Sequence, residues 1–226
     1  MNLAVPAIVC GVALGVVYTV SPLTVISLVA IAVFWSKVSP GLPDRERRWF
    51  GALILVAVAL RLAIIGGLFM TAPPDIPYAN FFGDEEFFKR KSTWLRNVAL
   101  GIPIHNADFL YAFDVTGDGG YVRVLTYLQA LFGLAPYGIH VLNMAWYICA
   151  VMLLFRMTAR SFGGPAALAG AATLLFLPSQ FLWSISALKE PLFVLLAAAN
   201  VWCAYAVVRA PHLWGKAAGT VAVVLT

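Results

Sequence analysis

Charged residues are scarce in this chain. Asp, Glu, Lys and Arg make up 11% of its 226 residues, whereas about a quarter is usual in a soluble domain. Hydrophobic residues make up 62%, and the mean hydropathy is +0.89. This composition excludes an ordinary soluble domain. Because a spanning helix needs about 20 mostly apolar residues, the length allows about six or seven spans and one sizeable loop.

Cysteine is also rare, and no CxxC motif is present. Cys10, Cys149 and Cys203 lie inside apolar stretches, so we interpret them as buried free thiols rather than a metal site. The net charge of +5 does not form one basic patch, because the Lys and Arg residues flank apolar segments. Membrane topology therefore explains the basic residues better than nucleic acid, which we do not expect as a partner.

Apolar segments predict an all-α fold, a polytopic transmembrane helix bundle. The expected spans cover about residues 3–20, 22–37, 49–70, 137–156, 164–182 and 191–208. Residues 1–48 would form a hairpin and a cytoplasmic loop, and residues 49–226 the main membrane region. Residues 217–226 are apolar but cover only about half a span, so we expect the chain to be truncated within a seventh helix.

Basic residues orient these spans. Cytoplasmic loops favour Lys and Arg, and the polar stretch 36–48 holds a cluster of them, as do the ends of later spans. The expected cytoplasmic residues are Lys37, Arg45, Arg47, Arg48, Arg156, Arg160, Arg209 and Lys216. The large first loop, about 71–136, then lies outside the cytoplasm, and a bacterial plasma membrane is the expected location.

The densest polar cluster runs from Gly83 to Arg96. On a helix, Phe87, Trp94 and Val98 share one face, while Lys89 and other polar residues point elsewhere. This pattern predicts an interfacial amphipathic helix. Its three opening carboxylates, 84–86, have two interpretations. One of them can act as a general base, or Asp84 can be the helix N-cap with its neighbours in the first turn.

Several short motifs together resemble the GT-C membrane glycosyltransferases, which include the protein O-mannosyltransferases and bacterial aminoarabinose transferases. The resemblance covers about residues 49–208. It rests on Arg61-Leu62, Asp84-Glu85 with Phe88, Tyr121-Val122-Arg123 to Leu131-Phe132-Gly133, Arg156 to Phe162-Gly163, Leu177-Pro178-Ser179, and Trp183-Ser184 to Lys189-Glu190-Pro191.

The resemblance implies that an acidic residue of the first extracytoplasmic loop acts as base on the acceptor or binds a metal, and that the sugar donor is carried on polyprenyl phosphate. Asp84 matches the catalytic position, and Glu85 is its neighbour. The implied substrate-binding residues are Arg61, Lys89, Arg90, Arg96, Arg123, Lys189 and Glu190. For each loop cation, contact with solvent or a lipid headgroup is the alternative.

Three of these candidates have specific alternatives. Arg61 falls past the midplane of its span, where an ionised side chain marks a functional or paired site unless it snorkels to the outer interface. Lys189 and Glu190 precede the last full span and would line the donor cavity, or would only anchor the helix end through the helix dipole.

The sequence assigns no metal ligand. Asp114 to Gly120 partly imitates an EF-hand loop, but its twelfth position is Leu125 instead of Glu, so a Gly/Asp turn is the better interpretation. A divalent cation between this turn and Asp84 stays an alternative. His105, His140 and His212 show no zinc-site spacing.

The expected function is therefore hexosyl or pentosyl transfer from a polyprenyl-phosphate donor to an extracytoplasmic glycan, lipid or protein acceptor, within membrane lipid. Asp84 would take the acceptor proton. Two other classes stay open: a transporter or flippase of lipid-linked saccharides, and a noncatalytic membrane subunit. Paired interrupted helices would favour a transporter, and none is evident from the sequence.

Overall fold

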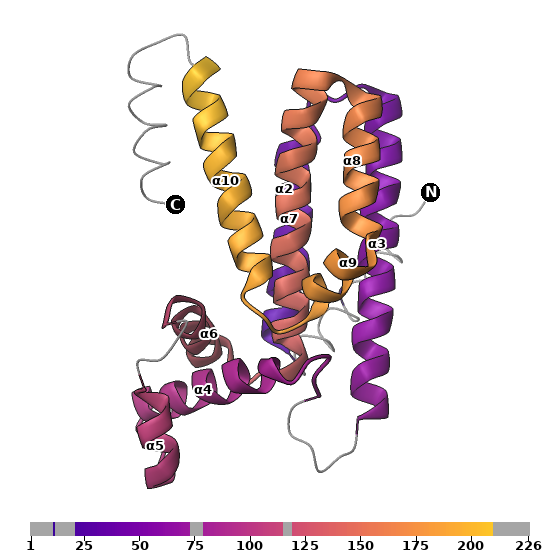
Figure 1. Ribbon diagram of the computed structural model, residues 1–226. Coiled ribbons are helices and arrows are strands. Elements are labelled where there is room, and N and C mark those ends of the chain that lie inside the picture. Colours follow the sequence, from indigo (N-terminus) through magenta and orange to yellow (C-terminus); the bar gives the residue numbers. More distant parts are fainter. Residues whose placement is uncertain (1–10, 12–20, 73–78, 115–118, 210–226) are drawn as a thin grey trace. The chain divides into compact units, whose positions relative to one another are not determined.

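The computed structural model describes residues 11, 21–72, 79–114 and 119–209, and these residues form helices and no strand (Figure 1). The predicted first span, 3–20, and the final apolar segment, 217–226, lie outside the described residues. The chain divides into two compact units, and each is described by itself. Unit 1 is drawn from Met1–Ala30, Ile64–Leu142 and Ser186–Leu188, and unit 2 from Ile31–Ala63, Asn143–Ile185 and Lys189–Thr226.

Three helices are long and apolar enough to cross a membrane: α3 (Asp44–Thr71), α7 (Pro136–Phe162) and α10 (Glu190–Arg209). They confirm the helices predicted at 49–70, 137–156 and 191–208. The helix predicted at 22–37 is α2 (Pro22–Val38), which is apolar but has 17 residues. At 1.5 Å per residue it is about 26 Å long, slightly shorter than a hydrocarbon core of about 30 Å.

The polar stretch 36–48 is only partly a loop, which corrects the sequence prediction. Helix α3 already begins at Asp44, so the basic cluster occupies its first turns. Asp44 and Glu46 favour this start through the helix dipole, and Arg47 pairs with Asp44 at 2.7 Å. Helix α7 likewise continues to Phe162, past the predicted end at 156. Charge marks where an apolar span ends, but a helix needs no apolar surface to continue.

The predicted span 164–182 is broken, and this is a second correction. Helix α8 (Gly164–Phe176) and helix α9 (Pro178–Ile185) meet at a bend of 61° (Figure 1). Pro178 has no N–H to donate, and it disfavours the helical conformation in the residue before it. Leu177 accordingly has an extended backbone, with φ −60° and ψ 122°.

Side chains from other helices satisfy the carbonyls that this break leaves open. In a continuous helix, the N–H groups at positions 178 and 179 would bond to the carbonyls of Leu174 and Leu175. Instead, the Tyr147 hydroxyl donates to Leu174 O at 2.8 Å, and Arg61 Nη2 donates to Leu175 O at 2.9 Å. Arg61 also reaches α9, because its Nε donates to Ser184 Oγ at 2.7 Å.

Arg61 is completely buried, which contradicts the snorkelling alternative. Its third hydrogen bond goes to Ala57 O at 3.2 Å, and its guanidinium lies 4.4 Å from the centre of the Phe181 ring. Among the described residues, no carboxylate forms an ion pair with it. Arg61 therefore holds the two arms of the bent pair through neutral oxygens and an aromatic face.

The predicted loop 71–136 is largely helical within unit 1. It contains α4 (Asp84–Ala99), α5 (Asn106–Ala112) and α6 (Gly119–Phe132), and α4 packs against both others (Figure 1). The helix predicted from the 83–96 cluster is thereby confirmed. Residues 115–118 of the EF-hand-like segment lie outside the described residues.

The face of α4 that packs against α6 carries several polar side chains. Gln129 of α6 donates to Ser92 Oγ at 2.7 Å and accepts from Thr93 Oγ1 at 3.3 Å, and its backbone carbonyl accepts from Arg96 Nε at 3.1 Å. On the predicted apolar face, Phe87 is 48% exposed. The amphipathic pattern was correct, and both hydrogen bonds and apolar contact join these helices: the buried rings of Phe88 and Tyr121 meet edge-on with centres 5.4 Å apart.

Replacing Arg61 by Leu should destabilise the fold, because it leaves Leu175 O and Ser184 Oγ buried without this donor. We expect a loss of about 1–3 kcal/mol in the free energy of unfolding, measured by thermal unfolding in detergent micelles. Arg45→Leu is the matched control, because Arg45 is exposed on the same helix. Equal unfolding midpoints for Arg61→Leu and the control would contradict this role.

Candidate functional site

The start of α4 carries the three adjacent carboxylates 84–86, and its geometry corrects the capping prediction. The helix begins at Asp84, so the N-cap residue is Gly83, and no side chain caps it. The N–H groups of Glu85 and Glu86 already donate to the carbonyls of Phe82 and Gly83, both at 3.3 Å. These bonds, each between residues three apart, occupy the N–H groups that would normally donate to a capping carboxylate. Asp84 is therefore the first helical residue instead of the cap.

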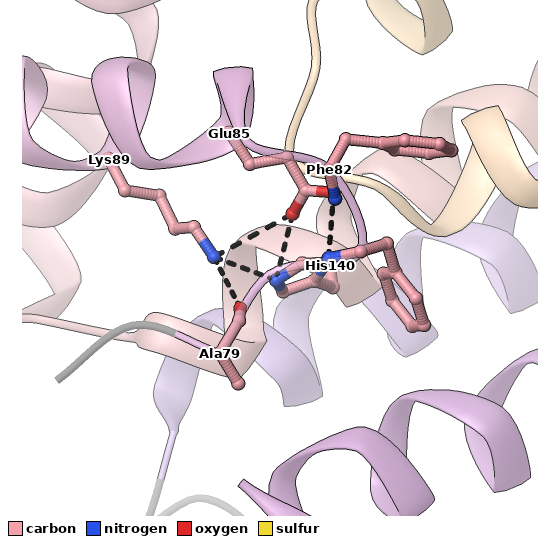
Figure 2. Close-up of polar contacts among 6 residues, drawn as sticks. Ala79, Phe82, Glu85, Lys89 and His140 are labelled. Atoms are coloured by element: carbon pink, nitrogen blue, oxygen red, sulfur yellow. Dashed lines mark hydrogen bonds and ion pairs between the residues drawn. The ribbon is translucent and has the colours of Figure 1, made fainter. Parts of the chain in front are cut away.

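Glu85 turns away from solvent and binds the chain segment before the helix. Its Oε1 accepts hydrogen bonds from the backbone N–H groups of Phe81, at 3.1 Å, and Phe82, at 3.0 Å (Figure 2). The Glu85 residue has no exposed surface. Its carboxylate thus fixes the direction in which the chain enters α4.

Lys89 and His140 complete a buried cluster with Glu85 (Figure 2). Lys89, one turn further along α4, donates to Ala79 O at 2.7 Å and lies 3.1 Å from His140 Nε2. Glu85 Oε2 lies 3.7 Å from both Lys89 Nζ and His140 Nε2. All three side chains are fully buried. The cluster joins α4, the segment before it and the first turns of α7 within unit 1.

Burial shifts the pKa values of the two α4 residues in the direction that neutralises both. Burial raises the pKa of Glu85, and the Lys89 charge and backbone N–H groups, including that of Ala187, oppose this. Burial lowers the pKa of Lys89 to about 8, although the Glu85 charge opposes it. The proton on Lys89 is therefore bound less firmly than on an exposed lysine.

Asp84 differs from Glu85 in its exposure to solvent and in its lack of bonded partners among the described residues. Its side chain is exposed, and no hydrogen bond or ion pair engages it in the part of the chain that the structure describes. Adjacent helical residues point about 100° apart, so the buried Glu85 and the exposed Asp84 are a direct consequence of the helix. Asp84 can accept a proton from a bound molecule, whereas Glu85 is enclosed.

Other predicted loop cations have varied surroundings in unit 1. Arg90 is half-exposed and pairs with Glu86 one turn earlier. Arg96 is held by Gln129 O and by Asn97 Oδ1, at 3.0 Å, so its hydrogen bonds serve the α4–α6 contact. Arg123 is exposed on α6. The structure thus brings Lys89 to Glu85 and leaves Arg90 and Arg123 open to solvent.

The remaining predicted site residues belong to unit 2. Glu190 is the first residue of α10, as the dipole alternative predicted. It lines a cavity of about 190 Å³ together with Tyr147 and Ser184, both of which contact Arg61. Its Oε2 is buried without a hydrogen-bond partner in the described part of the chain. Lys189 is partly exposed just before the helix.

Sequence reasoning missed His140 as a member of the buried cluster. The contact is tertiary, and no spacing relates His140 to residues 84–89. The available signal was a polar ring in the opening turns of an apolar span, where burial demands a partner. Edge-on contacts with Phe69 and Phe81, with ring centres at 5.5 and 5.6 Å, enclose it.

No group of three or more His, Cys, Asp or Glu side chains among the described residues is arranged to hold a metal ion. Comparison of the chain with protein-family models, with curated proteins and with solved structures finds no match. The geometry around the start of α4 and the sequence resemblance are the observations that bear on function.

The pKa of Lys89 predicts a specific pH dependence. Its value is about 8 in the folded chain and 10.5 for a free lysine. Between these values the unfolded chain binds more protons, so stability should rise with pH in that interval by about 3 kcal/mol. Lys89→Met should remove this rise, as measured by thermal unfolding in micelles between about pH 8 and pH 10.

Lys37→Met is the control for this titration, because Lys37 is exposed and its loss should leave the pH profile unchanged. The assignment to Lys89 fails if the wild-type and Lys89→Met profiles stay parallel across this interval.

Proposed function

We propose that this chain is a multi-pass membrane glycosyltransferase of the GT-C type. It transfers a hexosyl or pentosyl group from a polyprenyl-phosphate donor to an extracytoplasmic glycan, lipid or protein acceptor. Among the described residues, three helices are long and apolar enough to cross a membrane, and one bent pair would make a fourth span. These segments support the membrane location. The motif resemblance supports the reaction class.

One observation carries the proposal: two adjacent carboxylates at the start of α4 have opposite environments. Glu85 is buried and bonded to the backbone before the helix, and Asp84 is exposed and unpaired in the described chain. A general base needs an accessible carboxylate in a defined position. Glu85 supplies the defined position, and Asp84 supplies the accessible carboxylate.

The proposed reaction is a single displacement. Asp84 accepts the proton of the acceptor hydroxyl, whose oxygen forms a bond to the anomeric carbon of the sugar. The bond from that carbon to the phosphate oxygen breaks, and its electron pair leaves with the polyprenyl phosphate. One exposed carboxylate suffices for this step, since no covalent sugar intermediate forms.

In this account Glu85 is a positioning residue. Its hydrogen bonds to Phe81 and Phe82 hold the backbone immediately before Asp84, while Lys89 offsets its charge. The substrate-binding roles of Arg61, Lys89, Arg90, Arg96, Arg123, Lys189 and Glu190 stay predictions. Of these, Arg61, Lys89, Arg90 and Arg96 already bond to the protein itself.

Asp84→Asn should lower sugar transfer by about 100-fold or more, because the amide cannot accept the acceptor proton. The measurement is transfer of radiolabelled sugar from polyprenyl-phosphate donors in membranes with equal amounts of each variant. Glu86→Gln is the matched control: it removes a carboxylate from the same turn, and its half-exposed pair with Arg90 contributes little to stability.

Full activity of Asp84→Asn, or an equal loss in Glu86→Gln, would show that Asp84 is not the base. A wild-type chain that transfers no sugar from any polyprenyl donor would argue against the transferase itself.

A second candidate function is translocation of lipid-linked saccharides, and the bent pair α8–α9 favours it. Transporters use broken helices and buried ionisable residues at their substrate sites, and Arg61 bonds to both arms of this bend. Proteoliposomes that contain a lipid-linked saccharide but no acceptor separate the two functions. A transporter moves the lipid between leaflets with or without Asp84, and a transferase does not move it.

A further inference from the structure

A cleft of about 420 Å³ lies between α4, α5 and α6 of unit 1, within the size range of small-molecule sites. Two cations from different helices line it, Lys91 of α4 and Arg123 of α6. Lys91 lies seven residues after Asp84, which is about 10 Å along the helix. The cleft is therefore a separate feature from the proposed catalytic carboxylate.

Neither cation pairs with a carboxylate among the described residues. Lys91 is only 5% exposed, and its Nζ donates to the backbone carbonyl of Asp114 at 2.6 Å, which leaves two N–H groups and no carboxylate partner in the described chain. Arg123 is exposed and forms no ion pair with any described residue. Asp114 also lines the cleft, so the lining residues that the structure describes carry two positive charges and one negative charge. This balance favours an anion.

The walls of the cleft indicate that the anion belongs to a lipid. Apart from these charged groups, most lining side chains are apolar, among them Leu95, Val98, Phe113 and Val122. Large apolar side chains on α5 and α6 are exposed: Leu110 is 74% exposed, Tyr127 68% and Leu131 75%. Short helices with exposed apolar faces and neighbouring cations lie in the membrane interface. A free inorganic anion would gain no binding free energy from contact with apolar walls.

We propose that this cleft binds the phosphate headgroup of an anionic membrane phospholipid, held by Lys91 and Arg123. The phosphate oxygens accept hydrogen bonds from both side chains, and the glycerol and first chain carbons contact the apolar walls. The bound lipid would anchor α4, α5 and α6 to the membrane surface. This inference goes beyond the proposed function, because it requires no sugar transfer.

The test titrates the full chain in detergent micelles with dioleoyl phosphatidic acid, and native mass spectrometry counts the bound lipid. Phosphatidylcholine is the comparison lipid, and inorganic phosphate is the soluble competitor. We expect phosphatidic acid to bind at least about tenfold more tightly than phosphatidylcholine. Lys91→Gln and Arg123→Gln should each weaken phosphatidic acid about tenfold, because each removes a charged hydrogen bond.

Arg45→Gln is the control, because it removes the same charge from an exposed site outside the cleft. It should bind phosphatidic acid like wild type. Arg123 is exposed, so its substitution keeps the test valid even if the buried Lys91 variant fails to fold. The proposal is overturned if Arg123→Gln binds phosphatidic acid like wild type, if both lipids bind equally, or if inorganic phosphate displaces the lipid at equal concentration.

Discussion

A polar group buried by these apolar helices is costly unless it finds a partner within the chain, because a hydrocarbon core supplies no water. Both units are organised by this requirement. In unit 2, Tyr147 and Arg61 replace the two donors that the break at Pro178 removes. In unit 1, Glu85 is buried with Lys89, and its carboxylate satisfies the backbone before α4. These hydrogen bonds fix the bend at Pro178 and the start of α4.

This requirement also separates the roles of two neighbouring acids. A carboxylate enclosed by backbone donors and a lysine is fixed, but it cannot reach a substrate. A carboxylate one residue earlier points in another direction and keeps its freedom to react. The start of α4 therefore combines rigidity at Glu85 with accessibility at Asp84. This combination supports a base at Asp84 more strongly than either carboxylate would alone.

Composition and periodicity predicted the features that depend on local sequence. They predicted the helices around 22–37, 49–70, 137–156 and 191–208, and the polar cluster that became α4, because apolar length and helical period are properties of a short segment. They did not predict His140 beside Glu85, since that contact joins segments distant in the chain. Pro178 was visible in the sequence, but a bend there depends on partners such as Arg61. The polar face of α4 likewise depends on Gln129 of another helix.

The central claim is that Glu85 holds the backbone from which Asp84 is presented. Amide hydrogen exchange at Phe81 and Phe82 tests it most directly, because these two N–H groups donate to the Glu85 carboxylate. The account predicts slow exchange in the wild-type chain and at least about tenfold faster exchange in Glu85→Ala, as expected when a charged hydrogen bond is lost. Unchanged exchange at both amides would contradict it.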